Sequence, residues 1–165
     1  MKNNSKFSRR SLFILLIFSI PFSSCLASCS LNDEPAANKA SNNPPAYKNK
    51  SKMKLTVGDK IFKVTLLDNP SVNAFKALLP MTITMNELNN NEKVHYLNTA
   101  LPTNSRSVGK IHVGDFLLYG NNAVVLFYES FNTIYNYTRL GKVDDVTGLK
   151  EALGSGNVTV KFELQ

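Results

Sequence analysis

Residues 109–128 read GKIHVGDFLLYGNNAVVLFY, and this stretch decides the fold class. Apolar and polar residues alternate as far as Tyr119, a turn follows at residues 120–122, and residues 123–128 are almost wholly apolar. Alternation, a turn and a second apolar run together predict a β-hairpin. Because its second arm is apolar on both sides, it needs cover on both faces. We therefore expect it in a closed barrel or sandwich rather than at a sheet edge.

Strand and helix signals continue on both sides of this hairpin. Asn69 or Asp68 is expected to cap one helix and Asp144 or Asp145 a second, because such side chains satisfy the free amides of a first helical turn. The expected elements around the hairpin are, in order, strands at 54–57 and 61–67, a helix between Pro70 and Pro80, a strand at 81–85, a loop at 86–93, a short strand at 94–97, an ordered loop at 99–108, a strand at 134–143, a helix ending at Leu153 and a strand at 157–164. About eight short strands and two helices predict a mostly β fold, namely a closed eight-stranded barrel with the helices at its open ends.

The net charge of +7 is concentrated near the N-terminus. From Met53 onward, 11 Lys and Arg face 10 Asp and Glu, which leaves a net charge of +1. A nearly neutral domain lacks the basic surface of nucleic-acid-binding proteins, so we exclude DNA and RNA as partners. The two cysteines, Cys25 and Cys29, precede that domain, which therefore offers no thiolate nucleophile. With two His, no Gly-rich phosphate loop and no HExxH motif, we expect neither metal nor cofactor.

The first 28 residues have the composition of an export signal. Lys2, Lys6, Arg9 and Arg10 form a positive region, and residues 12–22 form an apolar one. Such an apolar segment rises about 16 Å as a helix, roughly half of a bilayer core. A cleaved signal is therefore favoured over a spanning helix.

Leu26-Ala27-Ser28-Cys29 follows the apolar region and resembles the lipobox of bacterial lipoproteins. The resemblance implies that Cys29 carries the lipid of an exported, membrane-anchored protein; the alternative is ordinary cleavage that leaves Cys29 as a free thiol. Several acyl chains attach a protein stably without a spanning helix. Ser30 in place of Asp resembles lipoproteins sorted to the outer membrane, facing the periplasm, in two-membrane bacteria. Residues 29–52, rich in Asn, Ala, Ser, Pro and Lys, are expected to form a disordered tether.

The remaining residues, 53–165, resemble the bacterial cyclophilin-like family, whose small domains are related in fold to peptidyl-prolyl isomerases. The segments that carry the resemblance are LPMTITM at 79–85, LPTN at 101–104, GKIHVGDFLLYG at 109–120, LFY at 126–128, YTRLGKV at 137–143 and LGSG at 153–156 with the closing strand. The resemblance implies an eight-stranded barrel capped by two helices, which agrees with the elements expected from the residue pattern. Related domains occur alongside flavodoxin-like proteins, which adds a flavodoxin-like or other envelope protein to the candidate partners.

Isomerase activity is not implied with the same clarity. In true cyclophilins an Arg, a Phe and a Gln line the proline cleft, and here residues 111–116, IHVGDF, resemble the second half of that motif with His112 in the place of the Gln. Counting back puts the aromatic position at Gly109 and the Arg position at Asn104, with Arg106 two residues away. Prolyl isomerases polarise the amide with an oriented Arg on an apolar floor, so the departure points to binding without strong isomerase activity.

Each candidate site residue has a functional and a structural interpretation. His112 is either a cleft residue that contacts a ligand or a strand residue hydrogen-bonded to a carbonyl or to Asp115. Arg139 is either a clamp for a carboxylate or a cation stacked on a tyrosine, and Arg106 is either a ligand-binding or catalytic residue or a solvated one. The aromatic candidates for a groove wall, otherwise core residues, are Tyr119, Tyr128 and Tyr137.

Three functional hypotheses remain open. The leading one is a membrane-tethered cyclophilin-like domain that binds a peptide or small ligand in a groove near His112, Arg106 and Arg139. The second is a weak peptidyl-prolyl isomerase that assists folding outside the cytoplasm, with Arg106 in the role of the catalytic Arg. The third is a structural or accessory component of an envelope complex, and an exposed apolar patch opposite the groove would favour this hypothesis.

Overall fold

The second half of the quoted stretch forms β7 (Asp115–Tyr119) and β8 (Ala123–Phe127) in a computed structural model that describes residues 50–165. The two strands pair as an antiparallel hairpin, and Gly120 in the turn has a φ of +59°, which favours glycine. All five residues of β8 are buried, so the expected cover on both faces is confirmed. The predicted leader, Cys29 and the predicted tether up to residue 49 lie outside the described residues.

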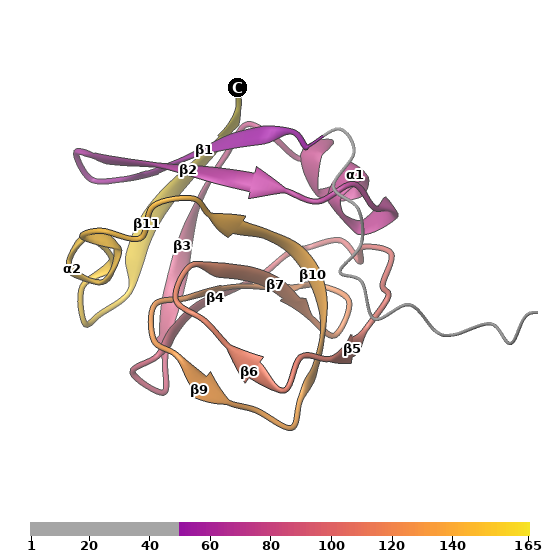
Figure 1. Ribbon diagram of the computed structural model, residues 1–165. Coiled ribbons are helices and arrows are strands. Elements are labelled where there is room, and N and C mark those ends of the chain that lie inside the picture. The colour runs from indigo at the N-terminus through magenta and orange to yellow at the C-terminus, as the bar shows by residue number, and fades with distance from the viewer. Residues whose placement is uncertain (1–49) are drawn as a thin grey trace, which may run out of the picture. The chain divides into compact units, whose positions relative to one another are not determined.

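Eight of the strands form one closed antiparallel barrel (Figure 1). Its order is β2-β1-β11-β3-β4-β8-β7-β10, and β10 pairs back onto β2 to close it. Besides β7 and β8, the strands are β1 (Lys52–Val57), β2 (Lys60–Leu66), β3 (Met81–Leu88), β4 (Glu92–Tyr96), β5 (Arg106–Ser107), β6 (Lys110–Ile111), β9 (Phe131–Asn132), β10 (Asn136–Val143) and β11 (Val158–Leu164). The predicted closed β-barrel is therefore confirmed, with β5 added beside β10 and with β6 and β9 paired outside it.

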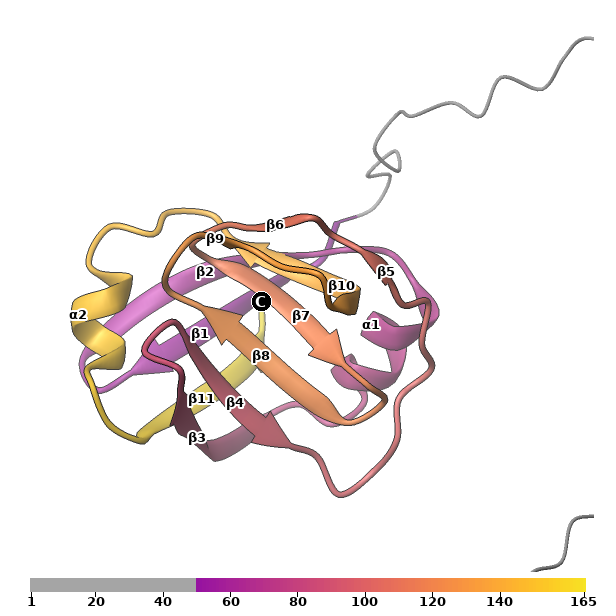
Figure 2. The same ribbon diagram turned by 90° about the horizontal axis from the view of Figure 1, so that it is seen from below.

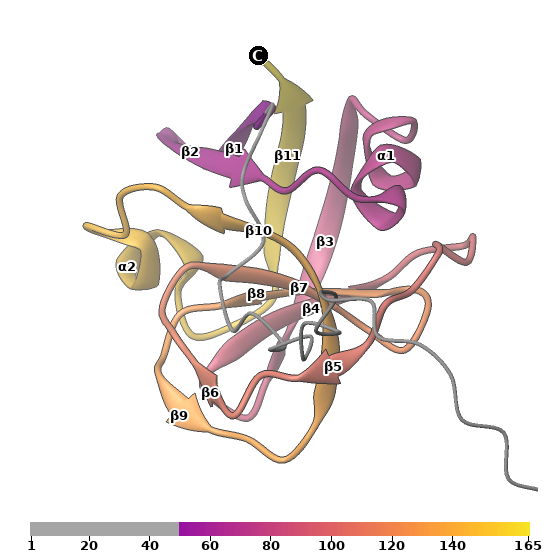
Figure 3. The ribbon, with the colours of Figure 1, turned by 45° about the vertical axis from the view of Figure 1, so that its right-hand side comes forward.

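Two short helices, α1 (Pro70–Lys76) and α2 (Leu149–Leu153), lie on opposite sides of the barrel (Figures 1 and 3). Val72 and Phe75 of α1 and the two leucines at the ends of α2 belong to the main buried cluster inside the barrel. The helices thus complete the core, as expected. Neither helix within residues 50–165 is long and apolar enough to cross a membrane.

The two helix caps differ from each other. Asn69 caps α1 as predicted, because its side chain accepts a hydrogen bond of 2.9 Å from the amide of Val72. The predicted carboxylate cap of α2 is wrong: the residue before the helix is Gly148, with a φ of +73° and no side-chain cap. Asp144 instead accepts hydrogen bonds from Lys52 and Thr65, and Asp145 accepts one from the amide of Thr147.

The predicted loop at residues 86–93 is wrong, because β3 runs on to Leu88 and β4 begins at Glu92. A tight turn joins them, and Asn89 and Asn90 both have a φ of +55°, a conformation that Asn tolerates better than most residues. Lys93, the last residue of the predicted loop, is fully buried and forms an ion pair with Glu87 across the turn. The Asn-rich composition therefore marks a hairpin turn rather than a longer loop.

The first arm of the quoted stretch is shorter than the predicted hairpin arm. Lys110–Ile111 leaves the barrel as β6 and pairs with β9. Gly114 turns the chain between β6 and β7 with a φ of +84°, and a Cβ at this position would lie 2.6 Å from a methyl group of Val146. The alternation in sequence continues through this turn, so the residue pattern alone predicts one continuous strand.

A second buried cluster lies on the outer face of β4, β8, β7 and β10. Figure 2 shows β4, β8 and β7 running side by side on this face of the barrel. The buried residues of this cluster are Val94, Ile111, Leu117, Ala123, Val125, Phe127 and Tyr137. Phe131 of β9 packs over them, with its ring centroid 5.8 Å from that of Phe127. The barrel wall is thus covered on the outside at this point, and two cavities open beside the cover.

Candidate functional site

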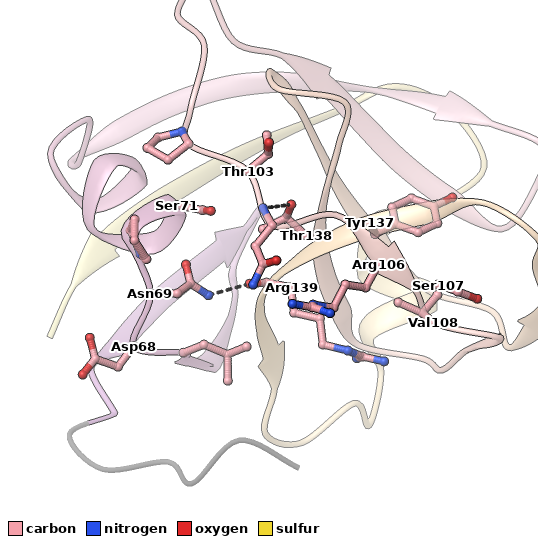
Figure 4. Close-up of a pocket in the computed structure, with 14 residues that line it drawn as sticks. Asp68, Asn69, Ser71, Thr103, Arg106, Ser107, Val108, Tyr137, Thr138 and Arg139 are labelled. Atoms are coloured by element: carbon pink, nitrogen blue, oxygen red, sulfur yellow. Dashed lines mark hydrogen bonds between the residues drawn. The ribbon is translucent and has the colours of Figure 1, made fainter. Parts of the chain in front are cut away.

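The larger of these two cavities has a volume of about 630 Å³ and lies where α1, β5 and β10 meet. Three chain segments line it: residues 67–71 between β2 and α1, residues 102–108 around β5, and residues 137–139 in β10. Figure 4 shows these residues around the cavity. The segments are far apart in sequence, so the barrel closure and the short β5–β10 pairing create this site.

Register places the two arginines of the cavity close together. In the β5–β10 pairing Arg106 lies opposite Tyr137, and Arg139 is two residues further along β10. Diagonal neighbours of this kind on one face of a sheet are about 5–8 Å apart at their Cβ atoms, within reach of long side chains. Figure 4 draws both arginines among the residues that line the cavity. The structure therefore brings Arg106, Arg139 and Tyr137 to one cavity.

Hydrogen bonds fix the wall beneath these arginines. The side chain of Asn69 caps α1 and also donates a hydrogen bond of 2.9 Å to the carbonyl oxygen of Arg139. The amide of Asn104 donates a bond of 2.9 Å to Oγ1 of Thr138, a residue that is only 2 % exposed. One bond joins the helix to β10 and the other joins the 102–108 segment to β10. The backbone around the cavity is therefore held in place independently of the arginine side chains.

The charges of the cavity favour an anion. Arg106 and Arg139 are exposed, and within residues 50–165 neither makes an ion pair or a hydrogen bond through its guanidinium group. Among the described residues that line the cavity, Asp68 is the one that is acidic. Each guanidinium group can bind a carboxylate or a phosphate through two parallel hydrogen bonds, which the ammonium group of a lysine cannot do. Tyr137, which is 6 % exposed, also lines the cavity.

The remaining candidates lie elsewhere. His112 is exposed in the turn after β6, where its backbone amide donates a hydrogen bond of 3.0 Å to Asp115, and it does not line the cavity. The hydroxyl of Tyr128 donates a bond of 2.7 Å to Glu87 at another end of the barrel. Tyr119 lines the second, smaller cavity, which it shares with Tyr137. The expected groove therefore contains the two arginines without His112, and a role for His112 stays a prediction.

Sequence reasoning missed one residue of consequence, Glu92. It lies at the start of β4 in the second cavity and is 8 % exposed. Burial, and secondarily the nearby charge of Glu87, raise the pKa of the Glu92 carboxyl to about 7. The sequence contains a pattern that could have identified this residue, because Glu92, Val94 and Tyr96 alternate as on one face of a strand. The predicted loop at 86–93 assigned Glu92 to no strand face.

Within residues 50–165, no three His, Cys, Asp or Glu side chains gather so as to hold a metal ion.

Comparison with known proteins agrees with this architecture. A solution structure of a hypothetical protein from Archaeoglobus fulgidus is similar to this chain, with a TM-score of 0.55 and 18 % identity over 70 % of this chain and 95 % of that one. At this identity the likeness shows the fold alone. No curated protein matches the chain. The model of the cyclophilin-like family matches residues 55–163, which is more than half of the sequence and includes all strands from β2 to β10 and both helices. The chain therefore belongs to the cyclophilin-like family.

Proposed function

We propose that this protein is a membrane-tethered binding domain of the cell envelope that takes an anionic peptide or small molecule between Arg106 and Arg139. The observation that carries the proposal is the pair of guanidinium groups without ionic partners in the described chain, on the wall of one cavity. Its volume of about 630 Å³ lies within the range of roughly 300–1,000 Å³ that is typical of small-ligand sites. The tether part of the proposal rests on the leader and on Cys29.

The other lining residues narrow the ligand class. Pro70, Pro102 and Val108 supply apolar surface, and Ser71 and Thr103 supply hydroxyl groups. A ligand with a carboxylate at one end and a short apolar body matches this arrangement of charges and surfaces. The C-terminal end of a peptide has this chemistry, and so does a small carboxylic acid with an apolar side chain.

One observation supports weak isomerase activity as a second candidate. Arg106 lies opposite Tyr137 in the strand register, so an arginine and a buried aromatic residue both line the cavity although the expected catalytic positions hold Asn104 and Gly109. A prolyl amide placed on Tyr137 would be within the general reach of Arg106. The geometry also supports simple binding of a carboxylate, which needs no reacting group, and for this reason binding is the leading proposal.

The test is a binding titration of the full chain with a short apolar peptide that has either a free or an amidated C-terminus. We expect the free carboxylate to bind and the amide to bind at least about tenfold more weakly, since a charge-assisted bidentate bond contributes about 1.5–3 kcal/mol. Arg106→Gln and Arg139→Gln should remove this preference. Lys110→Gln, which replaces an exposed cation outside the cavity, is the matched control and should retain it.

The same variants separate the two candidate functions. A prolyl isomerisation assay on the full chain should give no rate above background under the leading proposal. Catalysis that is present in the wild type and lost in Arg106→Gln, with no preference for a free carboxylate, would establish the isomerase and refute the binding proposal.

A further inference from the structure

The second cavity, of about 220 Å³, is lined by tyrosines from several strands on the outer face of the barrel. Tyr96 ends β4, Tyr119 ends β7, and Tyr135 and Tyr137 lie just before and within β10. The ring centroid of Tyr119 is 6.0 Å from that of Tyr135 and 5.5 Å from that of Tyr137, at interplanar angles of 82° and 52°. Rings inclined in this way do not form a flat stack, and all three line the cavity.

A single carboxylate, that of Glu92, lies in the same cavity. The residue is only 8 % exposed, and within residues 50–165 its side chain has neither an ion pair nor a hydrogen bond. The neighbouring cation, Lys93, cannot compensate for it, because Lys93 is directed to Glu87 and to the carbonyl oxygens of Gly154 and Gly156. Burying a charged group without a partner is unfavourable unless something supplies the opposite charge.

The position of Glu92 brings its charge close to the aromatic walls. Its backbone pairs with Phe127 of β8, whose ring lies edge-on to Tyr137 with centroids 5.7 Å apart. The phenol of Tyr137 responds to this neighbour: burial, and then the charge of Glu92, raise its pKa to about 12. Among the described residues that line the cavity there is no Lys, Arg or His. The cavity is thus both aromatic and negative.

Tyrosine faces and a carboxylate together attract an organic cation. The π-face of a tyrosine carries partial negative charge, and cages of such rings recognise quaternary and methylated ammonium groups. A metal ion would need several more oxygen ligands than this wall offers. The volume lies below the range of roughly 300–1,000 Å³ of typical ligand sites, so the cavity suits a head group and not a large molecule.

We propose that this cavity binds a small quaternary or alkylated ammonium group, held by the carboxylate of Glu92 and the rings of Tyr119, Tyr135 and Tyr137. The site is distinct in charge from the arginine cavity, with which it shares Tyr137 as a lining residue. The proposal therefore does not depend on the anion-binding function.

The first experiment compares choline with 3,3-dimethylbutan-1-ol, its neutral carbon isostere, by titration calorimetry on the full chain at pH 8. We expect saturable binding of choline and binding of the alcohol that is at least about tenfold weaker, because only the cation gains from the rings and the carboxylate. Tetramethylammonium should compete with choline. Absence of choline binding, or equal binding of the two isosteres, would overturn the proposal.

Two variants with matched controls locate the site. Glu92→Gln keeps the shape and removes the charge, and Tyr135→Leu removes a ring from a residue that is already 57 % exposed, so that the fold is retained even if the first variant proves unstable. Both should weaken choline binding about fivefold or more. Glu151→Gln, at an exposed acid outside the cavity, and Ile134→Ala, at a neighbouring residue that is 91 % exposed, should leave it unchanged. Equal losses in the control variants would show non-specific attraction and refute the assignment.

Discussion

Glu92 is a carboxylate in a position where the strand pattern requires an apolar residue. It shares the outer face of β4 with Val94, next to the buried cluster that Phe127 and Tyr137 form. Burial is the largest influence on its ionisation, and the charge of Glu87 adds to it, so that the pKa of the Glu92 carboxyl is raised to about 7. Strongly shifted pKa values cluster at functional sites, and Glu92 lines the second cavity.

The raised pKa of Glu92 predicts how stability depends on pH. Because the folded state disfavours the ionised carboxyl, the cost is absent below about pH 4.5 and grows as the pH rises towards about 7, above which it is constant. A shift of one pKa unit corresponds to 1.36 kcal/mol, so Glu92→Gln should raise the free energy of unfolding by up to about 3 kcal/mol at pH 8 and by little at pH 4.5. Denaturant unfolding at the two pH values, in buffers free of organic amines, measures the difference. A gain of equal size at both pH values would contradict this origin, and the exposed Glu151→Gln serves as the control.

At the scale of elements, local patterns predicted most of the strands and long-range pairing decided the rest. Asn69 and Pro70 correctly predicted the start of α1, and the apolar run that forms β8 correctly predicted a strand buried on both faces. The start of α2 was misplaced, because Asp144 has partners on other strands, Lys52 and Thr65, that no local pattern reveals. The run Asn89-Asn90-Asn91 predicts a loop at 86–93, and this pattern does not reveal that Lys93 is a buried strand residue whose partners include carbonyl oxygens 61 and 63 residues away.

The seam between β10 and β2 provides a prediction at this scale. Gly141 pairs with Leu66 where the barrel closes, and a Cβ at this glycine would lie 2.5 Å from the carbonyl oxygen of Thr65. Gly141→Ala should therefore push the two strands apart and lower the free energy of unfolding by about 1–3 kcal/mol, the usual cost of overpacking. Gly156→Ala is the matched control, because nothing lies within 4 Å of its added Cβ and its φ is not in the left-handed region. Thermal unfolding of both variants checks the prediction; equal midpoints would show that the seam tolerates a side chain.

At the scale of the whole molecule, the sequence predicts a groove near His112, Arg106 and Arg139, and of these three residues the structure brings the two arginines to one cavity. Arg106 and Arg139 are 33 positions apart, and only the two-residue β5–β10 ladder brings them to one cavity. His112 lies in the turn after β6, which pairs with β9 outside the barrel, and it does not line this cavity. Cavities depend on which segments meet across the barrel, and in this fold those segments meet through short pairings with weak sequence signals. The predicted export signal, in contrast, rests on local composition, so it can be tested without reference to the barrel.

The proposed anchoring predicts distinct behaviour for the two cysteines. If Cys29 carries the lipid, the wild-type chain should incorporate labelled palmitate and sediment with membranes, and Cys29→Ser should abolish incorporation and release the mature chain or leave its leader uncleaved. Cys25→Ser is the matched control: Cys25 belongs to the expected leader, so this variant should be labelled and anchored like the wild type. Labelling and fractionation of the three chains measure both properties. Palmitate labelling that persists in Cys29→Ser, or a wild-type chain that is soluble and unlabelled, would refute the lipoprotein assignment. The binding domain would then act as a freely exported protein or in another compartment.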